Sequence, residues 1–396
     1  MNLIESITFP KCSPPLPATL TNIIKMAREG VAGSTYTYDR LKELKEFDES
    51  KIGCKGLADS GITTIPRIFH HPPETVPKMD RSAESPAASL AEIPVIDLSD
   101  LESPTRRRLV VDQVRLAAST WGFFQVVSHG ISASVMERTS AAIKAFHEQP
   151  HQEKIKHYKR DEMNGFIYST NNDLYRSKAA NWHDHIQLWT GPTPPVASDI
   201  PDICRDEIIQ WDREATKVAD LVLELLAEGL GLDSKKFKEM GCTDCKALVG
   251  TCYPYCPEPE RTMGIAAHSD GQVLTVLMTN QVAGLQVKHG DDWIDVKPCR
   301  GGLIINIGDL LQAISNGVYR SVEHRVFANY SRELRISVVM FFNLLNWREG
   351  DMMGPLPELL SQDSPAIYRD FTKQEYLDKF LSNGYDSKSL LDFIRI

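Results

Sequence analysis

Three residues in the second half of the chain have the side chains of metal ligands: His268, Asp270 and His324. If His268 and Asp270 lie in a strand, they share one face of it, because residues i and i+2 point the same way. His324 must then arrive from a strand that is distant in the sequence and adjacent in space. Two imidazoles and one carboxylate leave positions on the metal open, and a set of three ligands without a thiolate suits Fe(II) better than Zn(II). The sequence therefore predicts an Fe(II) site with these three residues as metal ligands and catalytic residues.

A second pair, Arg335 and Ser337, repeats the i, i+2 spacing one strand later. A guanidinium fork beside a hydroxyl can hold a carboxylate through two parallel hydrogen bonds. The flanking Ile336, Val338, Val339 and Met340 indicate a strand that is buried on both faces, where an unpaired arginine would be costly. We therefore expect Arg335 and Ser337 to bind a carboxylate inside the protein.

Two other clusters suggest different metal sites. Cys242, Cys245, Cys252 and Cys256 resemble a four-cysteine zinc cluster, but the gap between Cys245 and Cys252 is short, so we expect reduced, separately packed thiols. His183 and His185, in Trp-His-Asp-His, form a second His-x-His. We expect them outside the sheet, in a loop or at the edge of a pocket, with substrate contact as the alternative.

Composition narrows the class of protein. The chain has 396 residues, of which 42% are hydrophobic and 24% charged, with a net charge of −9. This acidity argues against binding to nucleic acid or to an anionic membrane. Apolar runs are too short to span a bilayer, and the N-terminus, with Glu5 in its apolar stretch, is a poor signal peptide. We expect a cytoplasmic protein.

The periodicity changes along the chain. Residues 1–35 lack a period and predict a loose extension, and residues 70–89 predict a linker in which His70 and His71 are solvated. Helices are predicted over 38–47, 106–119 and 133–148, and a long amphipathic helix from Ile208 to Gly229 should pack behind the sheet. Strands are predicted over 93–97 (an edge strand) and 122–128. From Ala247 onward, short strands separated by glycine turns predict about eight strands, which suits a jelly roll.

Several motifs resemble those of the plant 2-oxoglutarate- and Fe(II)-dependent dioxygenases. Besides the three ligands and Arg-x-Ser, they are Trp121-Gly-Phe-Phe-Gln-Val-Val-Ser-His129, Tyr253-Pro-Tyr-Cys-Pro, Gly284-Leu-Gln-Val287 and Asn306-Ile-Gly-Asp-Leu-Leu-Gln312. The stretch Lys55-Gly-Leu-Ala-Asp-Ser-Gly-Ile resembles one branch of that family. The branch contains aminocyclopropanecarboxylate oxidase homologues, deacetoxyvindoline 4-hydroxylase and benzoxazinoid (DIBOA-glucoside) dioxygenases.

The resemblance implies a mostly β core with α-helices: a double-stranded β-helix (jelly roll) flanked by N-terminal and C-terminal helices. The parts are expected at 1–90 (N-terminal extension and linker), 91–240 (helical and strand region), 241–345 (jelly-roll core) and 346–396 (C-terminal helical cover).

It also implies the chemistry. Fe(II) and O₂ would oxidise a small molecule while 2-oxoglutarate is converted to succinate and CO₂, with ascorbate as reductant. Arg335, Ser337 and Tyr253 would hold 2-oxoglutarate. Thr251 stands where relatives usually carry Asn, so we expect it to change the affinity for 2-oxoglutarate. Phe341 should point into the barrel, toward the substrate or into the core, and His129 is expected to be structural.

Three functions follow as hypotheses. The first is hydroxylation of a plant specialised metabolite such as an alkaloid, a benzoxazinoid or another aromatic compound. The second uses the same iron site for desaturation, demethylation or ring closure, or as an ascorbate-dependent oxidase. The third is a non-catalytic jelly-roll binding protein. The presence of all three metal ligands and of Arg-x-Ser argues against it. We expect a monomer or a weak homo-oligomer.

Overall fold

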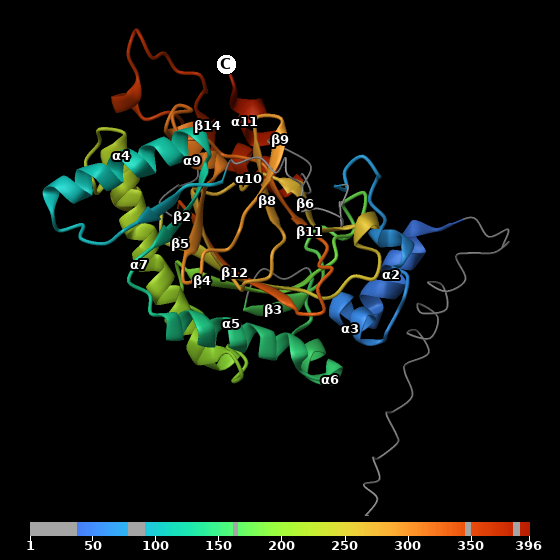
Figure 1. Cartoon of the computed structure of the whole chain (residues 1–396). Coiled ribbons are helices and arrows are strands. Elements are labelled where there is room, and N and C mark those ends of the chain that lie inside the picture. Colours follow the sequence, from blue (N-terminus) through green and yellow to red (C-terminus); the bar gives the residue numbers. More distant parts are fainter. Residues whose placement is uncertain (1–37, 78–91, 161–164, 345–349, 383–388) are drawn as a thin grey trace, which may run out of the picture.

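Two β-sheets that face one another form the centre of the molecule (Figure 1). The computed structural model describes residues 38–77, 92–160, 165–344, 350–382 and 389–396. In order across the large sheet, the strands are β1 (Val95–Asp97), β2 (Phe123–Val127), β10 (Leu303–Ile307), β7 (Leu274–Thr279), β12 (Arg335–Asn343), β5 (Cys245–Tyr253), β4 (Asp184–Gly191) and β3 (Phe166–Ser169). The small sheet contains β6 (Met263–His268), β11 (His324–Phe327), β8 (Leu285–His289) and β9 (Asp292–Asp295).

Neighbouring strands of both sheets are antiparallel, apart from the parallel pair β1–β2 at the edge of the large sheet. Within the described residues, the eight strands β5 to β12 lie between Cys245 and Asn343. The fold is the predicted jelly roll, with β1 at the predicted edge.

The two faces of the large sheet bury different partners, because side chains alternate along each strand. Even-numbered residues of β12, such as Val338 and Met340, join the core shared with the helices. On the other face, Tyr253 and Leu277 meet Leu285 and Val287 of the small sheet. The interior of the roll is therefore lined by the odd-numbered residues of β12 and β5.

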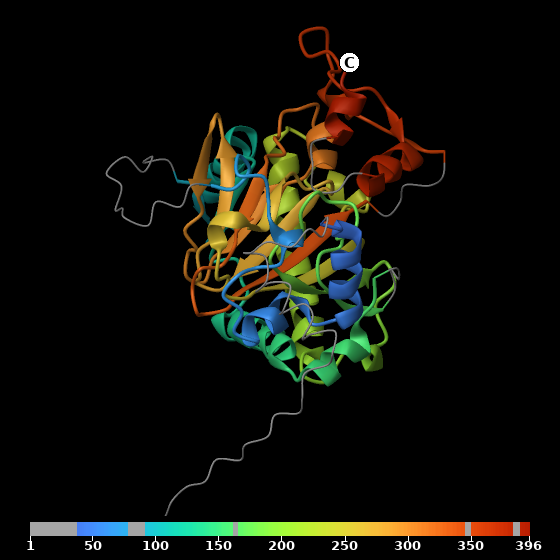
Figure 2. The same cartoon turned by 90° about the vertical axis from the view of Figure 1, so that its right-hand side faces the viewer.

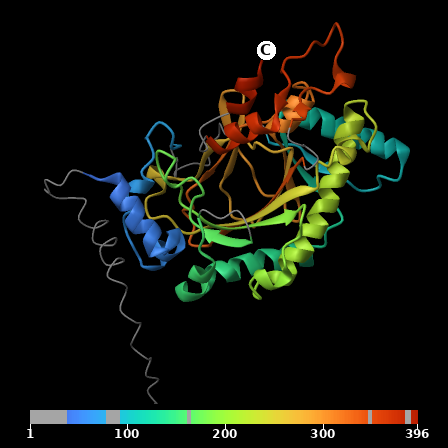
Figure 3. The same cartoon turned by 180° about the vertical axis from the view of Figure 1, so that it is seen from behind.

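Three helices cover the outer face of the large sheet: α4 (Pro104–Thr120), α5 (Ala133–Glu148) and α7 (Arg205–Gly229). Their positions confirm the predicted helices. Figure 3 shows α7 running along the back of the sheet, where it buries the stripe of Trp211, Ala215, Val218 and Val222. The chain can turn away after α7 because Gly231 adopts φ +76°.

An N-terminal unit docks beside β4 (Figure 2). It contains α2 (Arg40–Ser50), which Asp39 caps, and α3 (Gly53–Asp59). Its own core contains Leu44, Phe47, Leu57, Phe69 and Trp182.

Asp184 at the start of β4 connects this unit to the sheet. Its carboxylate accepts hydrogen bonds from the backbone N–H groups of Cys54 and Lys55, both at 2.8 Å, and from Thr170 Oγ1 at 2.6 Å. Gly53 allows this approach, since a Cβ there would lie 2.6 Å from Asp184 Oδ1. The favourable interaction of a carboxylate with the start of a helix adds to these bonds.

The C-terminal elements lie at one end of the roll (Figure 1). They are β13 (Met352–Met353), β14 (Phe371–Thr372), α10 (Lys373–Ser382) and α11 (Ser389–Ile394). The remaining short helices are α6 (His151–Lys154), α8 (Lys236–Glu239) and α9 (Asp309–Ile314), with 3-10 turns at Arg67–Phe69, Ile155–His157, Ala197–Asp199, Pro259–Arg261 and Pro357–Leu359. No helix in the described ranges combines the length and the apolar character needed to cross a membrane.

The predicted solvation of His70 and His71 is wrong. Both side chains are half-buried. His71 Nε2 lies 3.1 Å from the carbonyl oxygen of Ala180, and its backbone N–H donates to Arg261. The segment after the 67–69 turn packs against neighbouring loops rather than extending into solvent. The predicted extension 1–35 and the linker beyond residue 77 lie outside the described residues.

We predict that Asp184→Ala destabilises the protein by about 3 kcal/mol or more, because buried N–H and hydroxyl donors lose a charged acceptor. The midpoint of urea unfolding measures this loss. Asp59→Ala is the matched control, since the exposed carboxylate of Asp59 pairs with Lys55 and should contribute less than about 0.5 kcal/mol. Equal effects of the two substitutions would contradict a special role of Asp184.

Candidate active site

The structure brings His268, Asp270 and His324 together. His268 ends β6 and His324 begins β11, and the antiparallel register of these strands pairs the two residues directly. Their ring centroids are 4.2 Å apart. Each histidine Nε2 lies 3.7 Å from Asp270 Oδ1, and the three ligand atoms lie within 4.8 Å of one another.

Backbone carbonyl oxygens orient the rings of the two histidines. His268 Nδ1 lies 2.8 Å from the carbonyl oxygen of Ala266, and His324 Nδ1 lies 3.4 Å from that of Val322. A carbonyl oxygen only accepts hydrogen bonds, so the proton of each ring sits on Nδ1 and Nε2 keeps its lone pair for a metal.

Asp270 is oriented in the same manner. Its Oδ2 accepts hydrogen bonds from Thr275 Oγ1 at 2.6 Å and from Asn306 Nδ2 at 2.7 Å. Those two bonds leave Oδ1 to face the histidines.

The charges of the site favour metal binding. Burial lowers the pKa of His268, and the neighbouring His324 lowers it further, so the ring is neutral at pH 7. Burial alone would raise the pKa of Asp270, but the two histidines and the bonds from Thr275 and Asn306 bring it below its usual value. An ionised Asp270 beside a neutral His268 is the protonation state in which these two residues bind a divalent cation.

The donor set fits an iron ion. Adjacent ligands about 2.1 Å from an ion lie roughly 3 Å apart, so the 3.7 Å distances need only a small inward rotation of the side chains. Two nitrogens and one oxygen on one side leave the opposite side of the ion free for other ligands.

Arg335 lies inside the protein with a guanidinium that needs a partner. Its side chain is 2% exposed, and its Nε and Nη1 have no hydrogen-bond partner. The guanidinium lies 4.6 Å from the ring centroid of Tyr253, which is its direct neighbour across β12 and β5. Burial lowers the pKa of Arg335, with Tyr253 opposing the shift. A carboxylate placed here would satisfy both nitrogens.

A polar row crosses the sheet next to Arg335. Ser337 pairs with Thr251 on β5 and with Thr279 on β7, and Thr251 pairs with His185 on β4. These residues share the inner face, where they can hydrogen-bond a polar molecule that lies along the strands. The sequence-predicted group Arg335, Ser337, Tyr253 and Thr251 is therefore contiguous.

The prediction that His183 and His185 lie outside the sheet is wrong. His185 belongs to β4, and His183 immediately precedes that strand; both are buried. His183 Nδ1 lies 2.7 Å from the carbonyl oxygen of Gly264, and its ring centroid lies 5.8 Å from that of Tyr253. Pairing with β5, which has no local sequence signal, puts both histidines in the wall of the interior.

Comparison with known proteins agrees with this geometry. Residues 244–344 match the 2OG-Fe(II) oxygenase superfamily, and residues 93–203 match the N-terminal region described as non-haem dioxygenase in morphine synthesis. The chain is 44% identical over 360 residues to 1-aminocyclopropane-1-carboxylate oxidase homolog 1 of Arabidopsis thaliana, covering 90% of this chain and 97% of that protein. The chain belongs to the 2OG-Fe(II) oxygenase superfamily. A homolog from Solanum lycopersicum is 41% identical over 365 residues, covering 91% of the oxygenase and 98% of its relative.

Solved structures show the same fold. JOX2, crystallised in complex with 2OG, Fe and JA, is 28% identical with a TM-score of 0.74, covering 87% of the oxygenase and 97% of that chain. The rice dioxygenase for auxin oxidation is 23% identical with a TM-score of 0.65, covering 77% and 100%. At that identity, the second comparison supports the fold alone.

Three residues of the oxygenase site had no role assigned from the sequence: Thr275, Asn306 and Gly284. Asn306 is the one polar residue in the buried run Leu-Ile-Ile-Asn-Ile of β10, and this contrast is a usable signal. Thr275 offers no such contrast. A Cβ on Gly284 would lie 3.1 Å from Arg335 Cδ and Nε, so a glycine there gives the arginine room.

Other candidate features lie elsewhere. Among the described residues, the one group of possible ligands close enough to hold a metal is His268, Asp270 and His324, so the cysteines do not form a zinc cluster there. Each described cysteine is free. His129 is structural, with Nε2 3.0 Å from the Gly301 carbonyl oxygen and Nδ1 accepting from the Ile131 N–H.

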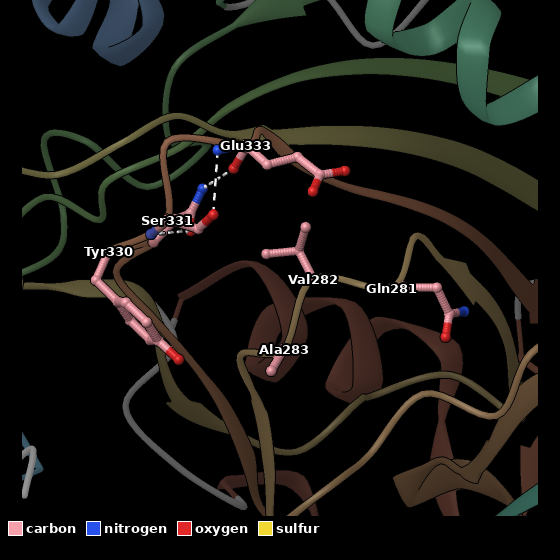
Figure 4. A pocket seen from close by; sticks show the side chains of 7 residues that line it. Gln281, Val282, Ala283, Tyr330, Ser331 and Glu333 are labelled. Carbon is pink, nitrogen blue, oxygen red and sulfur yellow. Dashed lines mark hydrogen bonds between the residues drawn. The ribbon is translucent and has the colours of Figure 1, made fainter. Parts of the chain in front are cut away.

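A surface hollow of about 260 Å³ lies between the 281–283 loop and the segment before β12 (Figure 4). In its wall, Asn329 hydrogen-bonds the backbone of Ser331 and of Glu333. None of the proposed metal ligands lines this hollow. We assign it no role.

We predict that Thr275→Val weakens metal binding about ten-fold or more, because Asp270 loses one of the two bonds that orient it. Titration of the apo-oxygenase with Co(II), followed by its absorption spectrum, measures the change. Thr243→Val is the matched control: Thr243 is also a buried threonine bonded to an aspartate, Asp220, but that aspartate is not a candidate ligand. An unchanged dissociation constant for Thr275→Val would contradict the orienting role.

Proposed function

We propose that this oxygenase hydroxylates a small plant specialised metabolite, such as an alkaloid, a benzoxazinoid or another aromatic compound. The observation that carries the proposal is the combination of three converging ligands with a buried arginine of which two nitrogens lack partners. The similarity to the aminocyclopropanecarboxylate oxidase homologues and to JOX2, which was crystallised with 2OG, Fe and an organic ligand, supports it.

The chain would hold the iron through His268, Asp270 and His324. Bound iron and 2-oxoglutarate together supply the oxidising chemistry, in which 2-oxoglutarate and O₂ become succinate and CO₂ and one oxygen atom enters the substrate. Asp270 would contribute negative charge, while Thr275 and Asn306 fix its direction.

Arg335 would hold the distal carboxylate of 2-oxoglutarate through the two nitrogens that otherwise lack partners. Tyr253 beside it and Ser337 two residues later would complete the hydrogen bonds. Thr251 would contribute a hydroxyl at a position where a longer amide side chain would reach further, so we expect an altered affinity for 2-oxoglutarate. The buried position of the guanidinium keeps competing water away from the ion pair.

The substrate would lie against the inner face of the large sheet. Phe341 pairs with Thr275, which donates to Asp270, and this register supports a position of the Phe341 side chain near the metal ligands. Phe341 is half-buried, whereas Met340 and Phe342 on the other face are fully buried. We place Phe341 against the substrate, and His183 and His185 in the adjoining wall.

A second function uses the same site for a different outcome: desaturation, demethylation, ring closure or an ascorbate-dependent oxidation. The names of the relatives at 40–44% identity favour keeping the oxidase alternative. A role for ascorbate, a cytoplasmic location, and a monomeric or weakly oligomeric state belong to the same proposal and rest on the sequence alone.

Untargeted mass spectrometry separates these functions. The oxygenase with Fe(II), ascorbate and O₂ is incubated with a plant metabolite extract, with and without 2-oxoglutarate. We expect a product heavier by one oxygen atom that depends on 2-oxoglutarate. A product lighter by two hydrogens would favour desaturation or ring closure, and the absence of both product and succinate would contradict the proposed function.

We predict that Asp270→Ala abolishes formation of both product and succinate while leaving the fold intact, since the iron would lose its one anionic ligand. Succinate assays and circular dichroism measure the two properties. Unchanged turnover would remove the metal assignment.

We predict that Arg335→Lys raises the KM for 2-oxoglutarate at least about ten-fold, because an ammonium cannot form the paired hydrogen bonds of a guanidinium. Succinate formation at varied 2-oxoglutarate measures KM, with the exposed Arg332→Lys as the control. Equal KM values for the two variants would argue against the carboxylate site.

A further inference from the structure

The side chain of Gln312 on α9 hydrogen-bonds two segments that are far apart in the sequence. Its Oε1 accepts from the backbone N–H of Ser321 at 2.6 Å, and its Nε2 donates to the hydroxyl oxygen of Tyr368 at 2.7 Å. Ser321 lies three residues before the proposed metal ligand His324, and Tyr368 lies among the C-terminal elements, between β13 and β14. One amide group therefore connects the backbone before a metal ligand with the C-terminal elements.

The hydrogen bond to Ser321 acts next to the group that orients His324. The carbonyl oxygen of Val322, the following residue, lies 3.4 Å from His324 Nδ1. Residues 315–323 belong to no helix or strand, so side-chain hydrogen bonds contribute to the position of their backbone. The partner of the second ring nitrogen fixes the orientation of a ligating histidine and affects its metal affinity. A displacement of the Ser321 backbone would move the Val322 carbonyl group and, with it, the histidine ring.

The start of α9 contacts the segment that carries Asp270. The backbone N–H of Asp309 donates to the carbonyl oxygen of Asp270 at 2.7 Å. Gly308, just before the helix, allows this approach, because a Cβ there would lie 1.9 Å from the carbonyl oxygen of Gln272. The helix is thus fixed to the backbone of one ligand at its start, and Gln312 extends from it to the backbone before another.

Tyr368, at the other end of the connection, is itself held in place. Its side chain is buried in the core that the helices share with the large sheet. Backbone hydrogen bonds join Ile367 to Ile396 at 3.1 Å, and Arg369 to Ile394 in α11 at 2.9 Å. The hydroxyl group that accepts from the glutamine therefore belongs to a packed part of the protein rather than to its surface.

We propose that Gln312 is a positioning residue of the metal site: it holds the backbone that orients His324 and, through Tyr368, makes metal affinity depend on the C-terminal elements. This inference rests on the proposed function, because His324 is assigned as a ligand of the same iron. Gln312 would act without contacting the metal. The C-terminal elements would likewise affect metal binding although they supply no ligand.

The test measures Co(II) binding to the full-length apo-oxygenase by its visible absorption spectrum, because the bands of the bound ion depend on ligand geometry. Gln312→Met keeps an unbranched side chain of similar length and removes both hydrogen bonds. We expect the dissociation constant to rise about three- to ten-fold, the range that one neutral hydrogen bond supports, and the bands to shift.

Gln125→Met is the matched control. Gln125 on β2 also bonds at both ends of its amide, accepting from the N–H of Cys299 at 2.9 Å and donating to the carbonyl oxygen of Lys297 at 3.2 Å. Neither partner lies in a segment that carries a proposed ligand. Both substitutions should lower the midpoint of urea unfolding, but Gln125→Met should leave the Co(II) dissociation constant and spectrum unchanged. The comparison separates loss of stability from loss of metal positioning.

Two further variants divide the connection into its parts. Gln312→Glu keeps an acceptor for the Ser321 N–H, and its carboxylate can also accept from the Tyr368 hydroxyl. This variant should therefore retain the spectrum of the unmodified protein and bind Co(II) no more weakly. Tyr368→Phe removes only the bond to the C-terminal elements, so we expect it to raise the dissociation constant about two-fold or more.

An unchanged dissociation constant and spectrum in Gln312→Met would overturn the positioning role, as would equal changes in Gln125→Met. A Gln312→Glu variant that behaves like Gln312→Met would overturn the hydrogen-bond mechanism, and unchanged Co(II) binding in Tyr368→Phe would overturn the connection to the C-terminal elements.

Binding of Co(II) by the unmodified protein, and its loss in Asp270→Ala, tests the metal site independently of Gln312. If this pattern is absent, the proposed function fails together with the inference. If it is present and the predictions for Gln312 fail, only the positioning role is wrong.

Discussion

The pairing of β6 with β11 is the constraint on which the site depends. It sets His268 directly opposite His324, so strand pairing brings together two ligands that are far apart in the sequence. A shift of this register by one residue would send His324 to the opposite face of the sheet, away from Asp270. The neighbouring pair β11–β8 secures the position, because β11 is held on both sides. The metal centre therefore depends on the strand register, which must be correct before the side chains can act as ligands together.

Hydrogen bonding divides the interior into two kinds of polar atoms. Those that must keep a fixed direction have partners: both histidine Nδ1 atoms and Asp270 Oδ2. Those that face the interior lack partners: two nitrogens of Arg335, Nδ1 of His185 and the indole nitrogen of Trp189. Leaving such groups unsatisfied is costly in a folded protein, and this cost is recovered when a ligand binds. Unpaired buried atoms also occur in the outer core, as at Trp211 Nε1 on α7, so an unpaired atom indicates a ligand only where it lies beside the proposed site, as the nitrogens of Arg335 do.

Much of this arrangement could be predicted from alternation within strands. The shared face of His268 and Asp270, and of Arg335, Ser337 and Phe341, follows from a period of two, and burial on both faces of β12 follows from its apolar neighbours. His183 and His185 were misplaced because the polar start of β4 conceals a strand whose membership is decided by pairing with β5. Thr275 was missed for a related reason: its contact with Asp270 depends on how the chain turns between β6 and β7, and nothing in the composition of either strand records that turn. The local sequence does not predict which distant residue a polar side chain such as Thr275 or His185 will contact.

The two faces of β4 contact different parts of the molecule: the outer face contacts the N-terminal unit, and the inner face lines the interior of the roll. Asp184 points to the outer side and receives the N–H groups at the start of α3, while His185 and Trp189, one and five residues later, point inward. On the side away from β5, β4 pairs with β3, a four-residue strand at the edge of the described sheet. A short edge strand gives limited support, so docking of the N-terminal unit through Asp184 supplies a second restraint on β4. The position of the interior wall therefore depends on residues near the beginning of the described chain, and a change in how α3 docks would alter the wall without touching a ligand of the metal.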